Sequence, residues 1–568
     1  MLQQQSPFHQ SFAVHTGAMA LKRRDILAHR DAQTLIASVL FVALCVVFRR
    51  FDIDDAFISY RYARHLGDGL GPVMNAGEHV EGVSNLPWTG LLGLLSAAGL
   101  EPHAAAPFLG IVCGFLAIGL VSELASRLTG DTRAGGPAAL LFAAWAPIAA
   151  WSVSGMETLA YTAAITWLFL EALRDPPPAG RGTGTGLVLG LVAALRPEGL
   201  LLALPLVAAA PRPGRWHLRA GLGAAVILGP LVAFRLVYYG DWLPNPVYAK
   251  ATLGTAALGS GLLYVGKMLA AFPIHFGSLL VARALLPSAA AARLLLGWVG
   301  VQVVFAFLVG GERFPGYRFL VPAWPAVAVA CELGLRALRR RELRAQRPAR
   351  VVALLCGVVG IVLVVTPGWI EPLAGGLLRL ARTYRDAPAH AARLAAETRF
   401  LGAVLVGVSL CVWYRVLSDA RLRDVQPVGG TKAARKRAHV AGRVIHESDA
   451  ARRAMAGALG LGLIMTLLPA VLDPALRACR SADPAAHYGR QVGEWLRAHA
   501  AESTLVATNG AGSLPYFSEL PVIDMLGLTD AHIARTRPDP SQWIGHEKGD
   551  AAYVLGRRPD IIVLGGPE

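Results

Sequence analysis

The stretch FDIDDAFISYRYARHLGDGLG (51–71) follows a long apolar run at 33–48, and together they decide the fold class. The run is nearly long enough to cross a bilayer, since a transmembrane helix takes about 17 to 25 residues. Two adjacent acids, Asp54 and Asp55, come within a few residues of its end. Ionisable side chains at membrane depth are costly, so this pair is a candidate functional feature.

The composition extends this interpretation to most of the chain. Of 568 residues, 54% are hydrophobic and 16% are charged, whereas soluble domains average about 25% charged residues. The net charge of +16 is concentrated in basic blocks at 21–30, 336–350 and 421–443. Each block adjoins an apolar run, which is the pattern of cytoplasmic loops in membrane proteins. A nucleic-acid-binding patch is the less favoured explanation of this charge.

About fourteen apolar runs are candidate membrane spans. They lie at 33–48, 86–100, 104–125, 136–151, 157–174, 185–195, 198–210, 218–238, 272–286, 290–309, 319–337, 351–369, 398–417 and 454–472. If 86–100 crossed the membrane, the basic blocks at 338–350 and 418–453 would face outward, against the positive-inside rule. We therefore expect 86–100 to lie in the interface and about 11 to 13 helices to span the membrane.

This topology predicts three parts of the chain. Residues 1–32 form a cytoplasmic segment, and residues 33–472 form the transmembrane domain with an outer loop at 49–103. Residues 473–568 contain short strand-like runs, TLVAT, LPVIDM and PDIIV, between helical segments, which indicates a small α/β domain. The fold class is thus an α-helical polytopic membrane protein with a C-terminal α/β domain outside the cytoplasm.

The outer loop carries the first set of candidate site residues. In a helix that begins near Asp54, Arg61 shares a stripe with Asp54, and Tyr62 lies beside Asp55. Glu81 follows in the same loop. The alternative is that the two aspartates are ordinary acids at a helix N-terminus, stabilised by free backbone N–H groups. One acid would suffice for that role, and a second adds repulsion.

The other outward-facing segments supply the remaining candidates. They are SGMET with Glu157, RPEG with Arg196 and Glu198, YYGDWLPNPVYAK with Asn245, Tyr248 and Lys250, and GGERFPGYRF with Glu312, Arg313 and Arg318. A helix break at the proline also explains RPEG. The aromatic residues of YYGDWLPNPVYAK also fit the belt of aromatic side chains found at membrane interfaces. Lys250 either extends toward the interface or binds a phosphate. Cations and carboxylates on one face suit an anionic, phospholipid-like substrate and an acid–base step.

The tail offers His546 in GHEKGD, and Asp524 and Asp530 near MLGLTD. GHEKGD is not the HExxH zinc motif, and the cysteines form no CxxC or Cys/His pattern, so no metal site and no obligatory cofactor is predicted. A divalent cation requirement is left open. The two aspartates either shape a surface loop or contact an acceptor.

Several motifs occur in order along most of the chain. They are DDAFISYRYARHLGDGLGPVMNAGEHVEGVSNLPW (54–88), SGMET (154–158), RPEG (196–199), YYG…PNPVYAK (238–250), GGE…RFLVPAWP (310–325) and GHEKGD…PDIIV (545–563). As an ordered set they resemble the GT-C membrane glycosyltransferases related to AftB-type arabinofuranosyltransferases and ZomB-like proteins. The resemblance implies a GT-C membrane domain, an extracytoplasmic cap domain and a location in the cytoplasmic (inner) membrane.

The resemblance also implies a reaction. A sugar, with arabinofuranose the implied choice, passes from a polyprenyl-phosphate donor to a cell-envelope glycan or glycolipid. The donor's phosphate leaves as a stable anion, so no general acid is needed; Asp54 or Asp55 acts as general base, and the anomeric centre inverts. Arg196, Lys250 and Arg318 are the predicted phosphate ligands. The residues predicted to bind or support the substrates are Arg61, Tyr62, Glu81, Glu157, Glu198, Asn245, Tyr248, Glu312 and His546.

Two alternatives belong to other functional classes. A lipid-linked sugar transporter predicts charged residues inside spans and inverted repeats, neither of which is evident in the sequence. A non-catalytic membrane scaffold with the same fold would bind donor without turnover.

Overall fold

The computed structural model describes residues 31–173, 181–209, 214–250, 255–272, 275–279, 282, 289–340, 459–460, 462–464, 466–471, 473–539 and 546–564. The apolar runs at 351–369 and 398–417, the basic block at 421–443 and nearly all of the segment 1–32 lie outside these residues.

Helices make up most of the N-terminal part. They are the helix Asp31–Phe48, α2 (Asp54–Gly67), α3 (Leu86–Ala97), α4 (Pro102–Thr129), η1 (Thr132–Ala134), α5 (Gly135–Ala143), α6 (Ala146–Val153), α7 (Thr158–Ala172), α8 (Arg181–Leu195), η2 (Pro197–Leu202), α9 (Ala203–Ala209), α10 (Gly214–Phe234), the π-helical turn η3 (Arg235–Tyr239), α11 (Asn245–Lys250), α12 (Thr255–Ala271), α14 (Ala289–Leu308), η4 (Arg318–Ala323) and α15 (Trp324–Arg340).

Five helices in the described part of the chain are long and apolar enough to cross a membrane. A sixth span is formed if Thr132–Ala143 and Ala146–Val153, which meet at a 65° bend, count as one. Their outward faces are apolar: on α10, Leu218, Leu222 and Val226 are 64%, 58% and 59% exposed at a four-residue spacing. Such a stripe of large exposed hydrophobic side chains has lipid as its natural solvent.

The interior of this bundle is packed with aromatic side chains. Trp145 of the α5–α6 bend stacks on Trp324 at the start of α15, with ring centroids 3.9 Å apart. Trp298 of α14 stacks on Phe169 of α7 at 4.5 Å. Trp145, Trp298 and Trp324 are at most 1% exposed. These rings join helices that are distant in the sequence.

The C-terminal part is a small α/β unit. It contains α20 (Pro474–Ala478), α21 (Pro484–His499), β1 (Val506–Thr508), α22 (Ser513–Ser518), β2 (Val522–Asp524), α23 (Ala531–Ala534), α24 (Ala551–Gly556) and β3 (Ile561–Val563). The three strands form a parallel sheet in the order β2-β1-β3, with Val506 opposite Val522 and Ile561. On one side of the sheet, Ala507 and Ile523 form a small core with Ile533 and Val554. Val506 and Val522 instead belong to a cluster with Ile58 and Tyr62 of α2.

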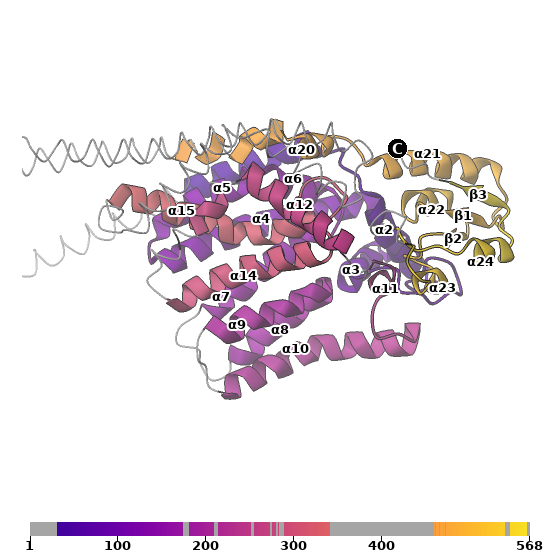
Figure 1. Cartoon of the computed structure of the whole chain (residues 1–568), viewed down its shortest axis with the longest axis horizontal. Helices are drawn as coiled ribbons and strands as arrows, with labels where there is room; N and C mark the ends of the chain where they lie inside the picture. Colours follow the sequence, from indigo (N-terminus) through magenta and orange to yellow (C-terminus); the bar gives the residue numbers. More distant parts are fainter. Residues whose placement is uncertain are drawn as a thin grey trace, which may run out of the picture.

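The α/β unit lies at one end of the helical bundle, with α2, α3 and α11 between the two (Figure 1). α3 has 12 residues and is therefore about 18 Å long, too short for a hydrocarbon core of about 30 Å. The predicted fold class, a helical polytopic membrane protein with a small C-terminal α/β unit, is confirmed. The three domain boundaries and the total number of spans remain predictions.

Candidate active site

The helix α2 begins at the aspartate pair. Ile53 is its N-cap and has extended backbone angles, so Asp54 and Asp55 occupy the first turn, while Arg64 and His65 lie in the last. This charge distribution suits the helix dipole. Consecutive helical residues point about 100° apart, so the two carboxylates leave the helix in different directions. Their surroundings differ accordingly.

Asp54 binds the C-terminal unit. Its Oδ2 accepts a hydrogen bond from the backbone N–H of Gly512 at 3.1 Å. Its Oδ1 accepts from the backbone N–H and the hydroxyl of Ser513 at 2.8 and 2.7 Å. Burial raises the pKa of Asp54, and these donors oppose the rise. The carboxylate thereby occupies the N-terminal end of α22 and is 8% exposed as a residue.

Asp55 faces a group of cations. Its Oδ2 lies 3.3 Å from the Nζ of Lys250 at the end of α11. Burial alone would raise the pKa of Asp55, but the charges of Lys250 and Arg318 and the hydrogen bond from Lys250 outweigh it and lower the pKa below its usual value. Asp55 is therefore an ionised carboxylate at neutral pH. Its side chain is 20% exposed, which leaves it accessible.

Arg318 brings a buried guanidinium to the same place. It forms an ion pair with Glu312 and is 5% exposed. The rings of Trp151 and Phe319 lie 5.6 and 5.3 Å from its guanidinium carbon. Nε and Nη1 of Arg318 have no hydrogen-bond partner among the described residues. Unpaired buried donors are costly, so these N–H groups are suited to a ligand that brings its own oxygen atoms.

The loop that carries Arg318 is fixed by local contacts. Gly316 has φ +88°, and an added Cβ there would lie 2.9 Å from Nε1 of Trp151 and 3.0 Å from Sγ of Cys479. The indole of Trp151 donates to the carbonyl of Gly316 at 2.8 Å. The hydroxyl of Tyr317 donates to Asp473 at 2.6 Å. These contacts position the guanidinium by joining the loop to the bundle and to the start of the C-terminal unit.

Arg196 lies near this centre, since its guanidinium carbon and that of Arg318 are each 5.3 Å from the ring of Phe319, but it is paired with carboxylates of its own. Its Nε lies 3.2 Å from Glu157 and 3.3 Å from Glu198, and all three are largely buried. The amide of Asn85 donates to Glu157 at 2.7 Å. Two carboxylates compensate one guanidinium, so little positive charge is left for an anionic ligand. This group joins the SGMET and RPEG segments to the outer loop.

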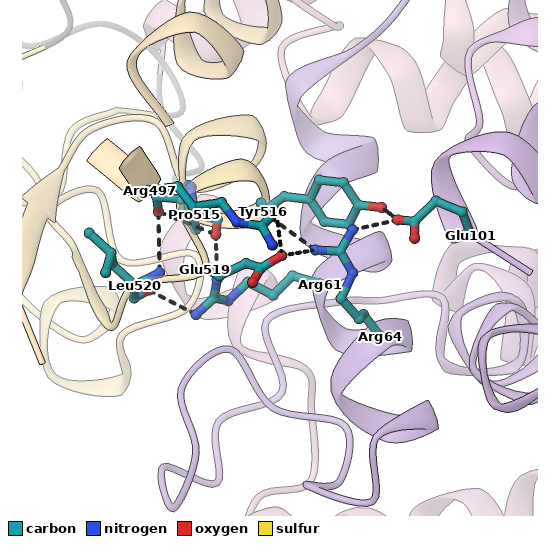
Figure 2. A network of polar contacts seen from close by, with 9 residues as sticks. Arg61, Arg64, Glu101, Arg497, Pro515, Tyr516, Glu519 and Leu520 are labelled. Carbon is teal, nitrogen blue, oxygen red and sulfur yellow. Dashed lines mark hydrogen bonds and ion pairs between the residues drawn. The ribbon is translucent and has the colours of Figure 1, made fainter. Parts of the chain in front are cut away.

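Arg61 and Arg64 of α2 attach the C-terminal unit to the outer loop (Figure 2). Arg61 donates to the carbonyls of Met74 at 2.9 Å and Leu520 at 2.8 Å, and also to the carbonyl of Pro515. Arg64 pairs with Glu101 and, at 3.2 Å, with Glu519. Burial and the charge of Arg64 lower the pKa of Arg61 to about 10, so it stays charged at neutral pH.

The remaining candidates support the outer loop. Tyr62 donates to the carbonyl of Val80 at 2.7 Å and accepts from the N–H of Gly82 at 2.9 Å. Glu81 pairs with Arg235 of η3 at 2.8 Å, and burial raises its pKa to about 7 against the effect of that arginine. These contacts join the loop around Glu81 to α2 on one side and to η3 on the other.

Asn245 and Tyr248 of α11 face the C-terminal unit. The amide of Asn245 donates to the carbonyls of Gly527 and Leu528 at 2.8 and 3.0 Å. The guanidinium carbon of Arg535 lies 4.4 Å from the ring centre of Tyr248. Together they hold α11, and with it Lys250, against the C-terminal unit.

Two tail aspartates have local structural contacts. Asp524 accepts from the N–H groups of Leu526 and Thr529 at 2.9 and 2.8 Å, and so shapes the loop after β2. Asp530 accepts from the N–H groups of His532 and Ile533 and caps α23. The contacts of both aspartates fit the first of the two explanations given above, in which they shape a surface loop.

Asp483, which precedes α21, is a residue that sequence reasoning missed. Burial and the charges of Asp54 and Asp55 raise its pKa to about 6. Its Oδ2 is buried and has no hydrogen-bond partner in the described part of the chain. The available signal was an Asp-Pro helix start at 483–484, which by itself indicates only a cap. Within the described residues, no three His, Cys, Asp or Glu side chains gather as a metal site.

Comparisons with known proteins give one family and several relatives. Residues 479–566 match a domain of unknown function (DUF8728). Two solved structures match the chain with TM-scores below 0.5. ArnT from Cupriavidus metallidurans bound to undecaprenyl phosphate has a TM-score of 0.46, 14% identity and 85% coverage of both chains. The Archaeoglobus fulgidus oligosaccharyltransferase has a TM-score of 0.35 and 13% identity, over 87% of this chain and 63% of that one.

A curated relative is more similar in sequence. Over 239 residues the chain is 30% identical to the terminal β-(1→2)-arabinofuranosyltransferase of Mycobacterium tuberculosis (strain ATCC 25618 / H37Rv). The match spans 39% of this chain and 38% of that enzyme. In this part of its length the chain is similar to an arabinofuranosyltransferase, which confirms the resemblance predicted from the ordered motifs.

Proposed function

We propose that this protein is a membrane glycosyltransferase. It transfers a sugar, arabinofuranose in the first instance, from a polyprenyl-phosphate donor to a hydroxyl of a cell-envelope glycan or glycolipid. The site faces the extracytoplasmic side of the inner membrane. The arabinofuranosyltransferase relative supports the reaction class, and the basic blocks beside the apolar runs support the orientation.

The observation that supports the proposal most strongly is that an ionised carboxylate lies close to cations, one of which has N–H groups without a hydrogen-bond partner among the described residues. Asp55 lies 3.3 Å from Lys250, and the charge of Arg318 acts on it. Nε and Nη1 of Arg318 have no partner among the described residues. A phosphate can bind to the arginine and lysine while a hydroxyl approaches Asp55, because arginine N–H groups bind two phosphate oxygens at once.

The transfer step follows from these positions. Asp55 accepts the proton of the acceptor hydroxyl as the acceptor oxygen bonds to the anomeric carbon. The bond between that carbon and the phosphate oxygen breaks, and its electron pair leaves with the polyprenyl phosphate. Arg318 and Lys250 stabilise the negative charge that grows on the leaving phosphate. Attack opposite the leaving group inverts the anomeric centre.

The other candidates have supporting roles in this proposal. Asp54 attaches α2 to the C-terminal unit, and Arg196 is neutralised by Glu157 and Glu198. Glu312 orients Arg318. His546 lies near Asp55 but is neutral at pH 7, because burial and the charges of Arg313 and Lys250 lower its pKa to about 4. In this proposal the predicted phosphate ligands are therefore reduced to Arg318 and Lys250, and Asp55 is the base.

The proposal is tested with the purified full-length chain in liposomes. Transfer from a synthetic polyprenyl-phosphate arabinofuranose donor to an octyl arabinofuranoside is followed by mass spectrometry. We expect wild type to form the glycosylated product and Asp55→Asn to lose about 10²- to 10⁴-fold in kcat, the usual contribution of a general base.

Two variants serve as controls. Asp68→Asn removes an exposed carboxylate just after the same helix and should retain full activity. Asp54→Asn should retain measurable turnover and chiefly weaken attachment of the C-terminal unit. Full activity of Asp55→Asn would contradict the base assignment, and absence of product with wild type would contradict the function.

A further inference from the structure

The start of α21 brings a third carboxylate to the aspartate pair. The backbone N–H of Asp483 donates to the carbonyl of Asp52 at 2.8 Å. Ser513 donates through its hydroxyl to Asp54 at 2.7 Å and to the carbonyl of Ala485 at 3.1 Å. Asp483 is thus bonded to the segment just before α2, and Ala485 is joined to Asp54 through Ser513, so the place of Asp483 beside the pair is determined by the fold.

The charges around Asp483 come from three elements. Asp54 and Asp55 face it from α2, and Arg313 acts on it from the loop before η4. His487 follows one turn later on its own helix. Asp483 therefore adds negative charge to a place that already holds two carboxylates, which costs stability.

One oxygen atom of Asp483 indicates why a third carboxylate is kept at this place. Oδ2 of Asp483 is buried and has no hydrogen-bond partner among the described residues, although the backbone N–H groups of Asp54 and Ala486 lie near enough to the carboxylate to oppose the rise of its pKa. A buried acceptor without a donor is destabilising by about 1 to 3 kcal/mol, so such an atom calls for an explanation. A sugar offers several neighbouring hydroxyls, each of which can donate to a carboxylate oxygen.

We propose that Asp483 is an acceptor-positioning residue, whose carboxylate accepts a hydrogen bond from a hydroxyl of the acceptor sugar next to the one that Asp55 deprotonates. The inference rests on the proposed function. It divides the two roles between carboxylates from distant parts of the chain: Asp55 of α2 takes the proton, and Asp483 of the C-terminal unit orients the sugar. The α/β unit then contributes directly to acceptor selection.

The experiment uses the same donor and octyl arabinofuranoside, at saturating donor and varied acceptor, from pH about 5 to 8. Wild-type kcat/KM for the acceptor should fall below pH about 6, where Asp483 gains a proton. At neutral pH, Asp483→Asn should lower kcat/KM about ten- to hundredfold, mainly through KM, because it removes one hydrogen bond to a charged group. The fall below pH about 6 should disappear in this variant.

Two further variants keep the test decisive. Asp483→Glu should restore part of the acceptor affinity and of the pH dependence, whereas Glu494→Gln, an exposed change on the same helix, should change neither. Binding of polyprenyl phosphate should be the same in wild type and Asp483→Asn, which also shows that the variant is folded. Unchanged KM and pH profile in Asp483→Asn would overturn the inference alone, while an inactive wild type would overturn the proposed function and the inference with it.

Discussion

Asp54 and Asp55 are neighbours in the chain but have different partners. Three donors from Gly512 and Ser513 occupy Asp54, whereas Asp55 has the Nζ of Lys250 at 3.3 Å and keeps 20% of its side chain exposed. The lowered pKa of Asp55 keeps it ionised, and the raised pKa of Asp483 makes that carboxyl change its protonation state near pH 6. The buried carboxylate of Asp483 lowers the stability of the folded protein, and such a cost is typical of residues kept for function.

Asp483→Asn should therefore stabilise the protein. The pKa of Asp483 in the folded protein, about 6, lies above the ordinary aspartate value of 3.8. The favourable contribution of its protonated form is therefore present below pH about 4 and lost as pH rises through about 6. Removing the charge should raise the free energy of unfolding by about 1 to 2 kcal/mol at pH 7.5, with little difference near pH 4. Thermal unfolding at the two pH values measures this.

Asp524→Asn is the matched comparison. Burial also raises the pKa of Asp524 to about 6, but its oxygens accept from the N–H groups of Leu526 and Thr529. Loss of those charge-assisted bonds should destabilise the protein. If both variants lowered the unfolding temperature at pH 7.5, the stabilisation expected of Asp483→Asn would be refuted.

At the scale of elements, α22 and α2 lie side by side, with Tyr516 of α22 against Phe57 and Tyr60 of α2. The first residues of α22 donate to Asp54, and Arg61 of α2 donates to carbonyls at its C-terminal side. This reciprocal arrangement needs a close approach at Gly512, where an added Cβ would lie 1.9 Å from the backbone oxygen of Asp54. A backbone atom in a helix cannot move aside as a flexible side chain can.

Gly512→Ala should therefore separate the two helices. The expected result is loss of the hydrogen bonds to Asp54, costing about 2 to 4 kcal/mol, and faster proteolysis of the C-terminal unit. Limited proteolysis of the purified protein followed by mass spectrometry measures this. Gly510→Ala is the control, because a Cβ there meets no atom closer than 3.8 Å. Equal protection of the two variants would show that the Gly512 contact does not hold the unit.

At the scale of the molecule, the candidate site lies where the helical bundle meets the α/β unit (Figure 1). Asp55 and Lys250 come from elements between the two parts, Arg318 from the end of a bundle helix, and Asp483 from the α/β unit. A site assembled in this way requires the α/β unit to lie on the same side of the membrane as the end of the bundle that it contacts.

The orientation can be tested with fusions to the C-terminus. Alkaline phosphatase fused after Glu568 should be active, and a fluorescent protein fused there should be dark, because we propose that the C-terminal unit is extracytoplasmic. The two reporters respond oppositely, so each controls for expression of the other. A bright fluorescent fusion with an inactive phosphatase would place the unit in the cytoplasm and contradict the proposed topology.

The sequence by itself determined the polytopic class, the α/β tail and the importance of the outer loop. Apolar runs, charge blocks and strand alternation are local properties, so they can be recognised without knowing the contacts. Asp55, Lys250 and Arg318 were found because each lies in a recognisable motif at the end of an apolar segment. Local pattern could not separate Asp54 from Asp55, since both fit the first turn of a helix.

Only the tertiary structure shows that hydrogen-bond donors saturate Asp54 and that Asp55 stays accessible. Asp54 meets Gly512 and Ser513, and Asp483 joins the pair, through contacts between residues more than four hundred positions apart. Arg196 looked like a phosphate ligand until its two carboxylate partners were seen in place. Charge compensation depends on distance in space, and neighbouring positions in the sequence carry no information about it.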